Sequence, residues 1–413
     1  MESIKENCHL TLNTTRICEN NPIDISIAIS EIAFANMKPN AVILIEEEDI
    51  FNSIAATPLV HLPINAAILF TDGRNLRGKT LKTIERLSPK GYKGIHAFLV
   101  GNISRQVSLE LNNHGYKTEH IKGSNHYETA CMIPSMREDF KNILIMSGED
   151  CTEGISATYW SAHHGDPILY VKHNSIPYCT IEAIRKNKDI NVYIIGSTKT
   201  VSKAVEKYLS RLENVKHLDR IDGDDSYDIS VNFAKYKSPK NQFGWDRNDK
   251  EGHAFTFGEL NHPMETIAGT LFAHMGKHTP LLLIRQDSVP EVVENYIESV
   301  KPTQKKNMPG PPFMHGFIIG DSQIIDHKAQ LMVEESLSID HEMMEISRNR
   351  CKSETVRDNL TDRVDANHYR YHMFQQEDDY REFNNHNDMI IGNHSYKRLN
   401  VDYNEVGINE LLG

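Results

Sequence analysis

Polar side chains follow short apolar segments at three places in the chain. The segments AVILI, NILIM and AFTFG are each followed within a few residues by carboxylates. The polar residues after the three segments are Glu46, Glu47, Glu48 and Asp49, then Glu149, Asp150 and Glu153, then Glu259, Asn261, His262 and Glu265. Oxygen ligands of this kind suit a cation or a polar ligand. Acidic residues also cap helices and oppose the helix dipole, and this structural role is the interpretation that we favour.

Two adjacent histidines, His163 and His164, lie close to Asp166 and could suggest a metal site. The chain holds 21 histidines and lacks the HExxH pattern, so we interpret the pair as surface polarity. The segment IIGSTKT at 194–200 could hold a phosphate on backbone amides, although a repeated turn explains it better.

The usual signatures of catalytic sites do not occur. The chain contains no GxxxxGK[ST], GxGxxG or GxSxG pattern. We therefore predict no catalytic residues, no metal and no cofactor. The alternative is an enzyme or regulator that uses the strand-end loops with a metal or a nucleotide.

Composition narrows the class of protein. The chain has 413 residues, 39% of them hydrophobic and 25% charged, as in globular proteins. Its net charge of −12 argues against nucleic acid as a partner. No apolar run approaches the length of a membrane span. The six cysteines form no CxxC pair, and we expect reduced thiols. The N-terminus lacks a signal-peptide pattern, which predicts synthesis in the cytoplasm without export by that route.

The polar groups belong to a repeat of three ordered elements. The first is an apolar strand, an acidic loop and a helix, at 41–60, 142–161 and 254–273. The second is an apolar strand followed by a turn and a helix, at 65–76, 166–177 and 279–290. The third is a strand that ends in glycine, at 96–104, 191–202 and 314–325. The first element recurs at offsets of 101 and then 112 residues, and the extra length fits a loop insertion at 244–253.

These patterns predict parallel α/β units. Continuous apolar strands such as VILI and PLLLI are typical of sheets buried on both faces. A fourth element, a loop entering a helix, precedes each unit at 16–30, 120–133 and 220–234. We predict three units, at 14–118, 119–218 and 219–346, each with a small, open, mainly parallel sheet.

The repeated motifs resemble the cell-wall-binding repeat type 2 family of Gram-positive surface proteins. The resemblance spans about residues 16–340, and the middle copy matches best. It is carried by Gly123, Tyr127, Glu128 and Thr129, by SGEDCTEGISA at 147–157, and by DPILYVKHNSIP and VYIIGSTKTVS. It implies three units about a pseudo-threefold axis and non-covalent binding to anionic wall polymers.

The chain departs from the family pattern at the positions that bear on ligand binding. The family's Arg before the entry-loop Tyr is His126 or Ser226, and in the first copy the Arg–Tyr pair is Pro22 and Ile23. The family's Asp in the first helix is Asn52, Glu153 and Glu265. Our candidate ligand-binding residues are Tyr127, Glu153, Tyr227 and Glu265, although packing between units is the simpler role for the tyrosines.

The tail at 347–413 is rich in Asn, His, Tyr and acidic residues and shows no regular period. We expect it to pack against its own domain or another subunit. The sequence therefore predicts a non-enzymatic protein that self-assembles through its tail, for example in a spore or cell-surface layer. The alternative partner is wall polysaccharide, reached by non-classical export.

Overall fold

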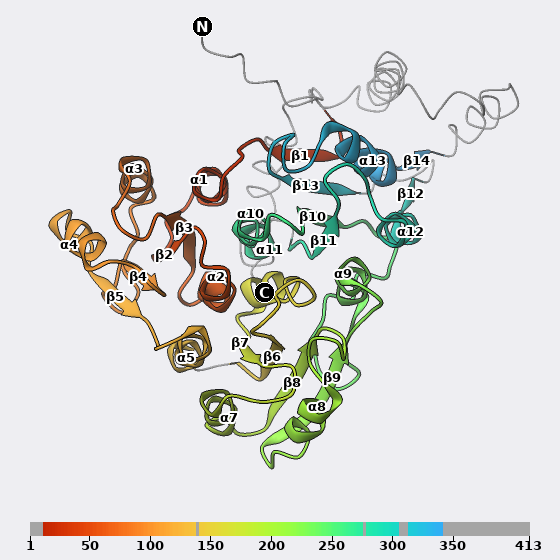
Figure 1. Ribbon diagram of the computed structural model, residues 1–413. Helices are drawn as coiled ribbons and strands as arrows, with labels where there is room; N and C mark the ends of the chain where they lie inside the picture. Colours follow the sequence, from red (N-terminus) through yellow and green to blue (C-terminus); the bar gives the residue numbers. More distant parts are fainter. Residues whose placement is uncertain (1–10, 138–139, 276–277, 305–312, 342–413) are drawn as a thin grey trace, which may run out of the picture.

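Three four-stranded parallel sheets, each flanked by helices, make up the protein. The computed structural model describes residues 11–137, 140–275, 278–304 and 313–341. Figure 1 shows the three units arranged around a common centre, which confirms the expected α/β class and the repeated open sheets. The tail at 347–413 lies outside the described residues.

The first sheet has the strand order β3-β2-β4-β5. Its strands are β2 (Ala41–Glu46), β3 (Ala66–Thr71), β4 (Ala97–Val100) and β5 (Thr118–Ile121). The connecting helices are α2 (Ile50–Ala56), the 3₁₀ turn η1 (Thr57–Val60), α3 (Gly78–Leu87) and α4 (Arg105–Asn113).

The second sheet repeats this order as β7-β6-β8-β9. Its strands are β6 (Asn142–Ser147), β7 (Ile168–Val171), β8 (Ile190–Ile195) and β9 (Val215–Ile221). Its helices are α5 (His126–Met132), the 3₁₀ turn η2 (Ile133–Met136), α6 (Ala157–His164), α7 (Tyr178–Arg185) and α8 (Lys203–Leu209).

The third sheet has the order β11-β10-β13-β1, and its fourth strand comes from the start of the chain. Its strands are β10 (Ala254–Glu259), β11 (Leu281–Ile284), β13 (His315–Ile319) and β1 (Thr14–Ile17). Its helices are α9 (Ser226–Lys235), α10 (Pro263–Ala268), α11 (Leu271–His274), α12 (Glu291–Val300) and α13 (His327–Leu337). A short parallel pair joins β12 (Thr303–Gln304) to β14 (Asp340–His341).

The apolar runs form buried strands because helices cover the sheets on both faces. Every residue of β3, β6 and β10 is buried. After the third strand of each sheet the chain turns at Gly101, Gly196 or Gly320, whose φ angles of 78°, 129° and 103° disfavour a side chain. The repeated glycines thus mark equivalent turns.

Each entry helix leaves the fourth strand of one sheet and packs on the second strand of the next. The helices are α1 (Pro22–Ala33), α5 and α9, and their caps Asn21, Asn125 and Asp225 each accept from the backbone N–H three residues on. The hydroxyls of Ser26 and Ser230 accept from the backbone of β3 and β11. Consecutive units are therefore linked through these helices.

The strand β1 gives the last sheet its fourth strand, at the edge beside β13. Thr14 pairs with Gly316 and Ile17 with Ile319, in parallel. The buried carboxylate of Glu334 accepts from the backbone N–H groups of Leu12 and Asn13, at 3.0 and 2.8 Å. The predicted boundary at residue 14 was drawn without this pairing, and the division into 14–118, 119–218 and 219–346 stays a prediction.

The fourth strands share one side-chain contact that shows their equivalence. His120 of β5, Arg220 of β9 and Arg16 of β1 each contact the carbonyl oxygen of the turn glycine, at 2.8, 2.7 and 2.8 Å. Arg16 also donates to the carbonyl oxygen of Ile325 at 2.6 Å. The first strand of the chain thus occupies in the third sheet the place of β5 and β9.

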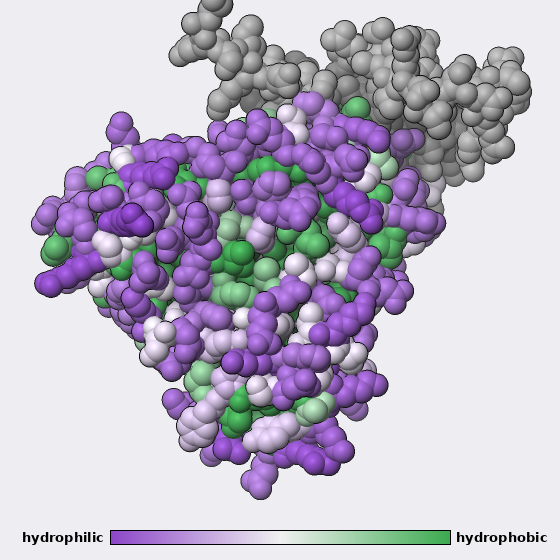
Figure 2. All heavy atoms as spheres, in the orientation of Figure 1, coloured by the Kyte–Doolittle hydropathy of each residue, from purple (hydrophilic) through white to green (hydrophobic). Residues whose placement is uncertain are grey.

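The helices that follow the first strand of each sheet meet at the centre. The phenol of Tyr159 on α6 is fully buried and donates to the carbonyl oxygen of Thr266 at 2.8 Å. A Cβ at Gly269 would lie 2.3 Å from that phenol oxygen. Figure 2 shows a hydrophilic periphery around hydrophobic side chains near this centre.

Histidines from all three units also meet near the centre. The Nδ1 atoms of His61 and His274 lie 3.3 Å apart, and those of His163 and His278 lie 3.2 Å apart. Burial, with the neighbouring His274 and Arg137, lowers the pKa of His61 to about 3. Burial, with His278 and Arg137, lowers the pKa of His274 to about 4. Burial also lowers the pKa of His163 well below its ordinary value. His163 is half-buried and packs in this cluster, whereas His164 is exposed as expected.

The loop insertion expected at 244–253 packs against the second unit, because Trp245 is buried and stacks on His163 with ring centroids 4.9 Å apart. Cys18 is disulfide-bonded, while Cys131, Cys151 and Cys179 are free. The expectation of reduced thiols is therefore wrong for Cys18.

Replacing Arg16 by Ala should lower the free energy of unfolding by about 2 to 3 kcal/mol, because charged hydrogen bonds to several carbonyl groups are lost. Arg220→Ala should have a similar effect, whereas Arg105→Ala, at an exposed position without a side-chain partner among the described residues, should change stability by less than about 0.5 kcal/mol. Chemical denaturation measures all three. An Arg16→Ala effect no larger than that of Arg105→Ala would contradict the role given to β1.

The central histidines should make stability depend on pH. The folded chain keeps them neutral below the ordinary histidine pKa of about 6.5, whereas the unfolded chain takes up protons there. Stability is therefore full above about pH 6.5 and falls toward pH 4, by up to about 1.4 kcal/mol per pH unit for each such histidine.

Denaturation of variants between about pH 7.5 and pH 4.5 checks this slope. The repeat offset of 101 residues places Ala162 at the position equivalent to His61, so His61→Ala combined with His274→Ala copies the second unit. The double variant should lose stability less steeply toward acid, and the exposed His173→Ala should keep the original slope. An unchanged slope in the double variant would rule out these histidines as its source.

Candidate functional site

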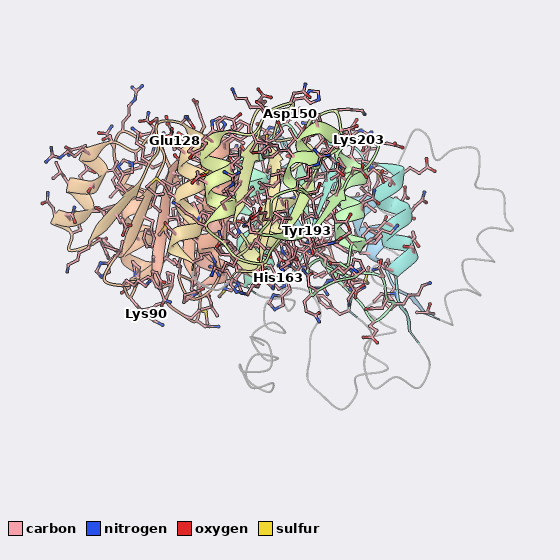
Figure 3. All side chains as sticks on the ribbon, turned by 90° about the horizontal axis from the view of Figure 1, so that it is seen from below. Lys90, Glu128, Asp150, His163, Tyr193 and Lys203 are labelled. Carbon is pink, nitrogen blue, oxygen red and sulfur yellow. The ribbon has the colours of Figure 1, made fainter. Side chains whose placement is uncertain are left out.

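The strand-end loops of all three sheets gather at one end of the molecule. This follows from parallel strands and similarly oriented sheets, and it is where open α/β sheets bind ligands. Figure 3 shows Glu128, Asp150 and Lys203 at this end, with Lys90 and His163 at the opposite end. Asp150 of a strand-end loop and Glu128 of an entry helix therefore share one face, and His163 lies away from it.

Three junctions between units lie at this end, and each is built around an entry helix. We call them the α5 junction, the α9 junction and the α1 junction. Each combines the entry helix with the loops that follow the first two strands of its own unit. The preceding unit contributes its first helix, as in the packing of α5 against α2 and of α1 against α10. Equivalent positions of the three junctions can therefore be compared.

In the α5 junction, Tyr127 packs against Gly148, and the Lys172 side chain lies over its ring. A Cβ at Gly148 would lie 2.6 Å from Cε1 of Tyr127, so the phenol ring fills the space of a side chain there. The Lys172 ammonium group lies 6.0 Å from the ring centroid. Burial and the nearby Glu149 raise the pKa of Tyr127, which stays a neutral phenol.

His126 joins this tyrosine to the first unit. Its ring stacks on Phe51 with centroids 4.6 Å apart, and its Nε2 lies 3.0 Å from the carbonyl oxygen of Gly148. Burial lowers the pKa of His126. Below it, the buried phenol of Tyr170 donates to the carbonyl oxygen of Phe51. His126, which stands where the family has Arg, is thus part of the packing between units.

The α9 junction repeats the pairing of cation and tyrosine. The Arg285 guanidinium lies 4.7 Å from the ring centroid of Tyr227. Burial is the main reason that the pKa of Tyr227 is raised. Among the described residues, neither Lys172 nor Arg285 has a carboxylate partner for its charged group. Both residues are exposed.

The α1 junction is different in charge and shape. The position of the tyrosine holds Ile23, which is fully buried. Arg77 lies 3.3 Å from Glu47 and 3.7 Å from Asp72, so its charge is already matched. From the third unit, Glu265 has its pKa raised by burial, and the neighbouring Glu259 and Glu47 act in the same direction. The α1 junction is therefore predominantly acidic.

Glu153 holds a loop together. Its carboxylate accepts from the backbone N–H of Ser197 at 2.7 Å, from the Ser197 hydroxyl at 2.9 Å and from the Thr200 hydroxyl at 2.6 Å. In the third unit the residue beside the turn glycine is Ile324, and no described hydroxyl takes the place of Thr200 on Glu265. The two glutamates therefore have different surroundings in spite of their equivalent positions.

Metal binding receives no support from the described residues. Within the described ranges, no group of three or more His, Cys, Asp or Glu side chains is placed to hold a metal ion. His164 lies 3.1 Å from the buried Asp166, which also accepts from the indole N–H of Trp160 at 2.8 Å and from the side-chain amide of Asn142 at 3.1 Å. These contacts tie α6 to the start of β7. Among the described residues, no helix is both long and apolar enough to cross a membrane.

Of the predicted residues, the two tyrosines lie at equivalent sites, whereas the two glutamates have different surroundings. Tyr127 and Tyr227 occupy equivalent junctions, each below a basic residue. Reasoning from the sequence missed Lys172 and Arg285, although both follow the second strand of their unit at the same position. The ligand-binding role of Tyr127, Glu153, Tyr227 and Glu265 stays a prediction.

Comparisons with known proteins agree with this architecture. A family model described as cell wall binding domain 2 matches residues 120–206. The amidase enhancer of Bacillus subtilis (strain 168) is 25% identical over 260 residues, or 62% of this chain and 33% of the enhancer. The N-acetylmuramoyl-L-alanine amidase LytC of that strain is 23% identical over 187 residues, or 45% of this chain and 35% of the amidase. The chain thus spans about a third of the length of these curated relatives.

Two solved structures share the fold. Cwp6 from Clostridium difficile superposes with a TM-score of 0.63 and 18% identity, over 79% of this chain and 51% of Cwp6. Cwp8 from Clostridium difficile gives 0.63 and 20%, over 79% of this chain and 52% of Cwp8. The match of residues 120–206 of the second unit to the cell wall binding domain 2 model confirms the resemblance that the sequence motifs indicated.

Proposed function

We propose that this protein binds a bacterial cell-wall polymer non-covalently and does so without catalysis. The observation that carries the proposal is the match to the cell wall binding domain 2 model over residues 120–206. The repeat places Tyr127, with an exposed cation above its ring, at the end of the sheet where ligands bind. An aromatic ring with neighbouring polar and charged groups suits a sugar polymer that carries negative charge.

The relatives support a wall-associated role. One is named an amidase enhancer and the other an N-acetylmuramoyl-L-alanine amidase. Because the chain matches only about a third of each, we infer from them attachment to the wall and not the activity of the whole relative. The disulfide at Cys18 also fits a location outside the reducing cytoplasm.

The charge of the whole chain sets a limit on this binding. A net charge of −12 opposes broad attraction to an anionic polymer, so contact must depend on local positive groups. We propose Tyr127 and Tyr227 as direct contacts. We propose that Glu153 and Glu265 act indirectly, by holding the loops on which the polymer rests. The hydrogen bonds of Glu153 to the 197–200 loop support that role in the second unit.

Self-assembly through the tail is a separate proposal, including a place in a spore or cell-surface layer. It rests on the composition of residues 347–413, which lie outside the described residues. Sedimentation of the full chain and of a chain ending at Ile346 tests it. Larger species formed by the full chain alone would support assembly, and identical sedimentation of the two would refute it.

Cosedimentation with purified Bacillus subtilis walls tests the wall proposal. The full chain should bind intact walls, and binding should fall severalfold after acid extraction of the covalently attached anionic polymers. It should also weaken with added salt, because ion pairs to the polymer are screened. Failure to bind intact walls would contradict the proposal, and undiminished binding to extracted walls would show that peptidoglycan is the ligand.

Substitutions at the second unit test the proposed residues. Tyr127→Phe combined with Glu153→Ala should reduce binding to intact walls, since a phenol hydroxyl is lost and the 197–200 loop is released. Glu153→Gln keeps one oxygen that can accept from both the Ser197 N–H and the Thr200 hydroxyl, and its amide N–H can donate to the Ser197 hydroxyl, so it serves as the milder control. Thermal unfolding monitors folding. Unchanged wall binding by the folded double variant would remove Tyr127 and Glu153 from the site.

A further inference from the structure

We propose that the wall polymer occupies two of the three junctions, and that Lys172 and Arg285 bind its negatively charged groups. The α5 and α9 junctions are the two sites. The α1 junction is excluded by its own negative charge. This inference rests on the proposed wall-polymer function and adds to it the number of sites and the residues that recognise charge.

The strand register shows that Asp72, Lys172 and Arg285 occupy equivalent positions in the three units. Ile43 pairs with Ile68, Leu144 with Ile168, and Thr256 with Leu281, each between the first and second strand of a sheet. Four residues beyond Ile68, Ile168 and Leu281 stand Asp72, Lys172 and Arg285. The same place at the mouth of each junction thus carries a cation twice and an anion once.

The two cations are free to bind a ligand. Both side chains are exposed, and among the described residues neither charged group is paired with a carboxylate. Each lies over a tyrosine ring, which holds the cation by its electron-rich face and leaves the hydrogen-bond donors unused. A phosphate or carboxylate of the polymer can accept from these donors while a sugar contacts the phenol.

The α1 junction lacks each part of this arrangement. Ile23 replaces the tyrosine and is fully buried, so no aromatic ring is presented. Asp72 replaces the cation, the nearby Arg77 is engaged by Glu47 and Asp72, and the exposed Arg74 lies near the carboxylate of Glu46. Lys79 is paired with Asp24 on the entry helix. An anionic group placed here would meet like charges at short range, which repel it.

Two sites in one rigid arrangement also explain how a protein of net charge −12 can hold a long anionic polymer. Each site alone contributes one exposed cation and one ring, which is a weak contact. A repeating polymer that reaches both sites binds the second without a new loss of translational freedom. Loss of either cation should therefore affect a long polymer more than a short oligomer.

Isothermal titration of the full chain with a short poly(glycerol phosphate) oligomer tests the number of sites. We expect two oligomers per wild-type chain and one per chain for Lys172→Glu or Arg285→Glu. The variant with both changes should bind at least tenfold more weakly. Lys90→Glu is the matched control, because it makes the same charge change at an exposed lysine of the opposite end. It should bind like the wild type.

The reverse change tests the α1 junction. Asp72→Lys should leave the two sites intact and strengthen overall binding to long poly(glycerol phosphate), while the matched Asp189→Lys, at an exposed position beside Lys216, should not. Thermal unfolding confirms that each variant is folded. Dextran, an uncharged polysaccharide, should not bind measurably in any of these titrations.

The outcomes separate this inference from the proposed function. A double variant that binds walls and the oligomer like the wild type overturns the role of Lys172 and Arg285 and leaves wall binding standing. Three oligomers per wild-type chain overturn the exclusion of the α1 junction. Equal losses in Lys90→Glu show that net charge alone acts, which also overturns the inference. A wild-type chain that binds neither walls nor oligomer overturns both proposals.

Discussion

The pairing of β1 with β13 is the constraint on which the rest of the structure depends. Every entry helix passes from the edge of one sheet to the next unit, so a chain of three units leaves one sheet without its fourth strand. Residues 14–17 fill that place, and Arg16 and Glu334 fix it through buried polar contacts. The closed arrangement brings α1 against α10 and so creates the third junction.

The pairing of β1 with β13 gives all three units the same fold, but the side chains at their junctions differ. The backbone caps and turn glycines repeat nearly unchanged, because they are needed for each unit to form. Side chains at the mouths of the junctions are under no such requirement. There Tyr127 and Tyr227 correspond to Ile23, and two cations correspond to Asp72. Binding can therefore differ between junctions without any cost to the architecture.

The sequence predicted what depends on local pattern. Continuous apolar runs such as VILI became buried parallel strands, and the entry loops became capped helices. It did not predict that β1 joins the third sheet, since a pairing between Thr14 and Gly316 leaves no local signal. The sequence did not predict that Lys172 contacts Tyr127, because the two lie 45 positions apart in the chain and only the folded sheet brings them together. The packing of His163 was not predicted because its ring contacts come from Trp245 and His278, which lie far away in the chain.

Hydrogen–deuterium exchange with and without bound wall polymer tests the central claim most directly, because it reports on all three junctions in one experiment. The account predicts slower exchange on binding in the entry loops at 122–129 and 222–228 and in the loops at 172–175 and 285–288. It predicts no change at 46–49 or 72–76. Protection that is equal at all three junctions, or confined to the end of the molecule that carries Lys90, would contradict it.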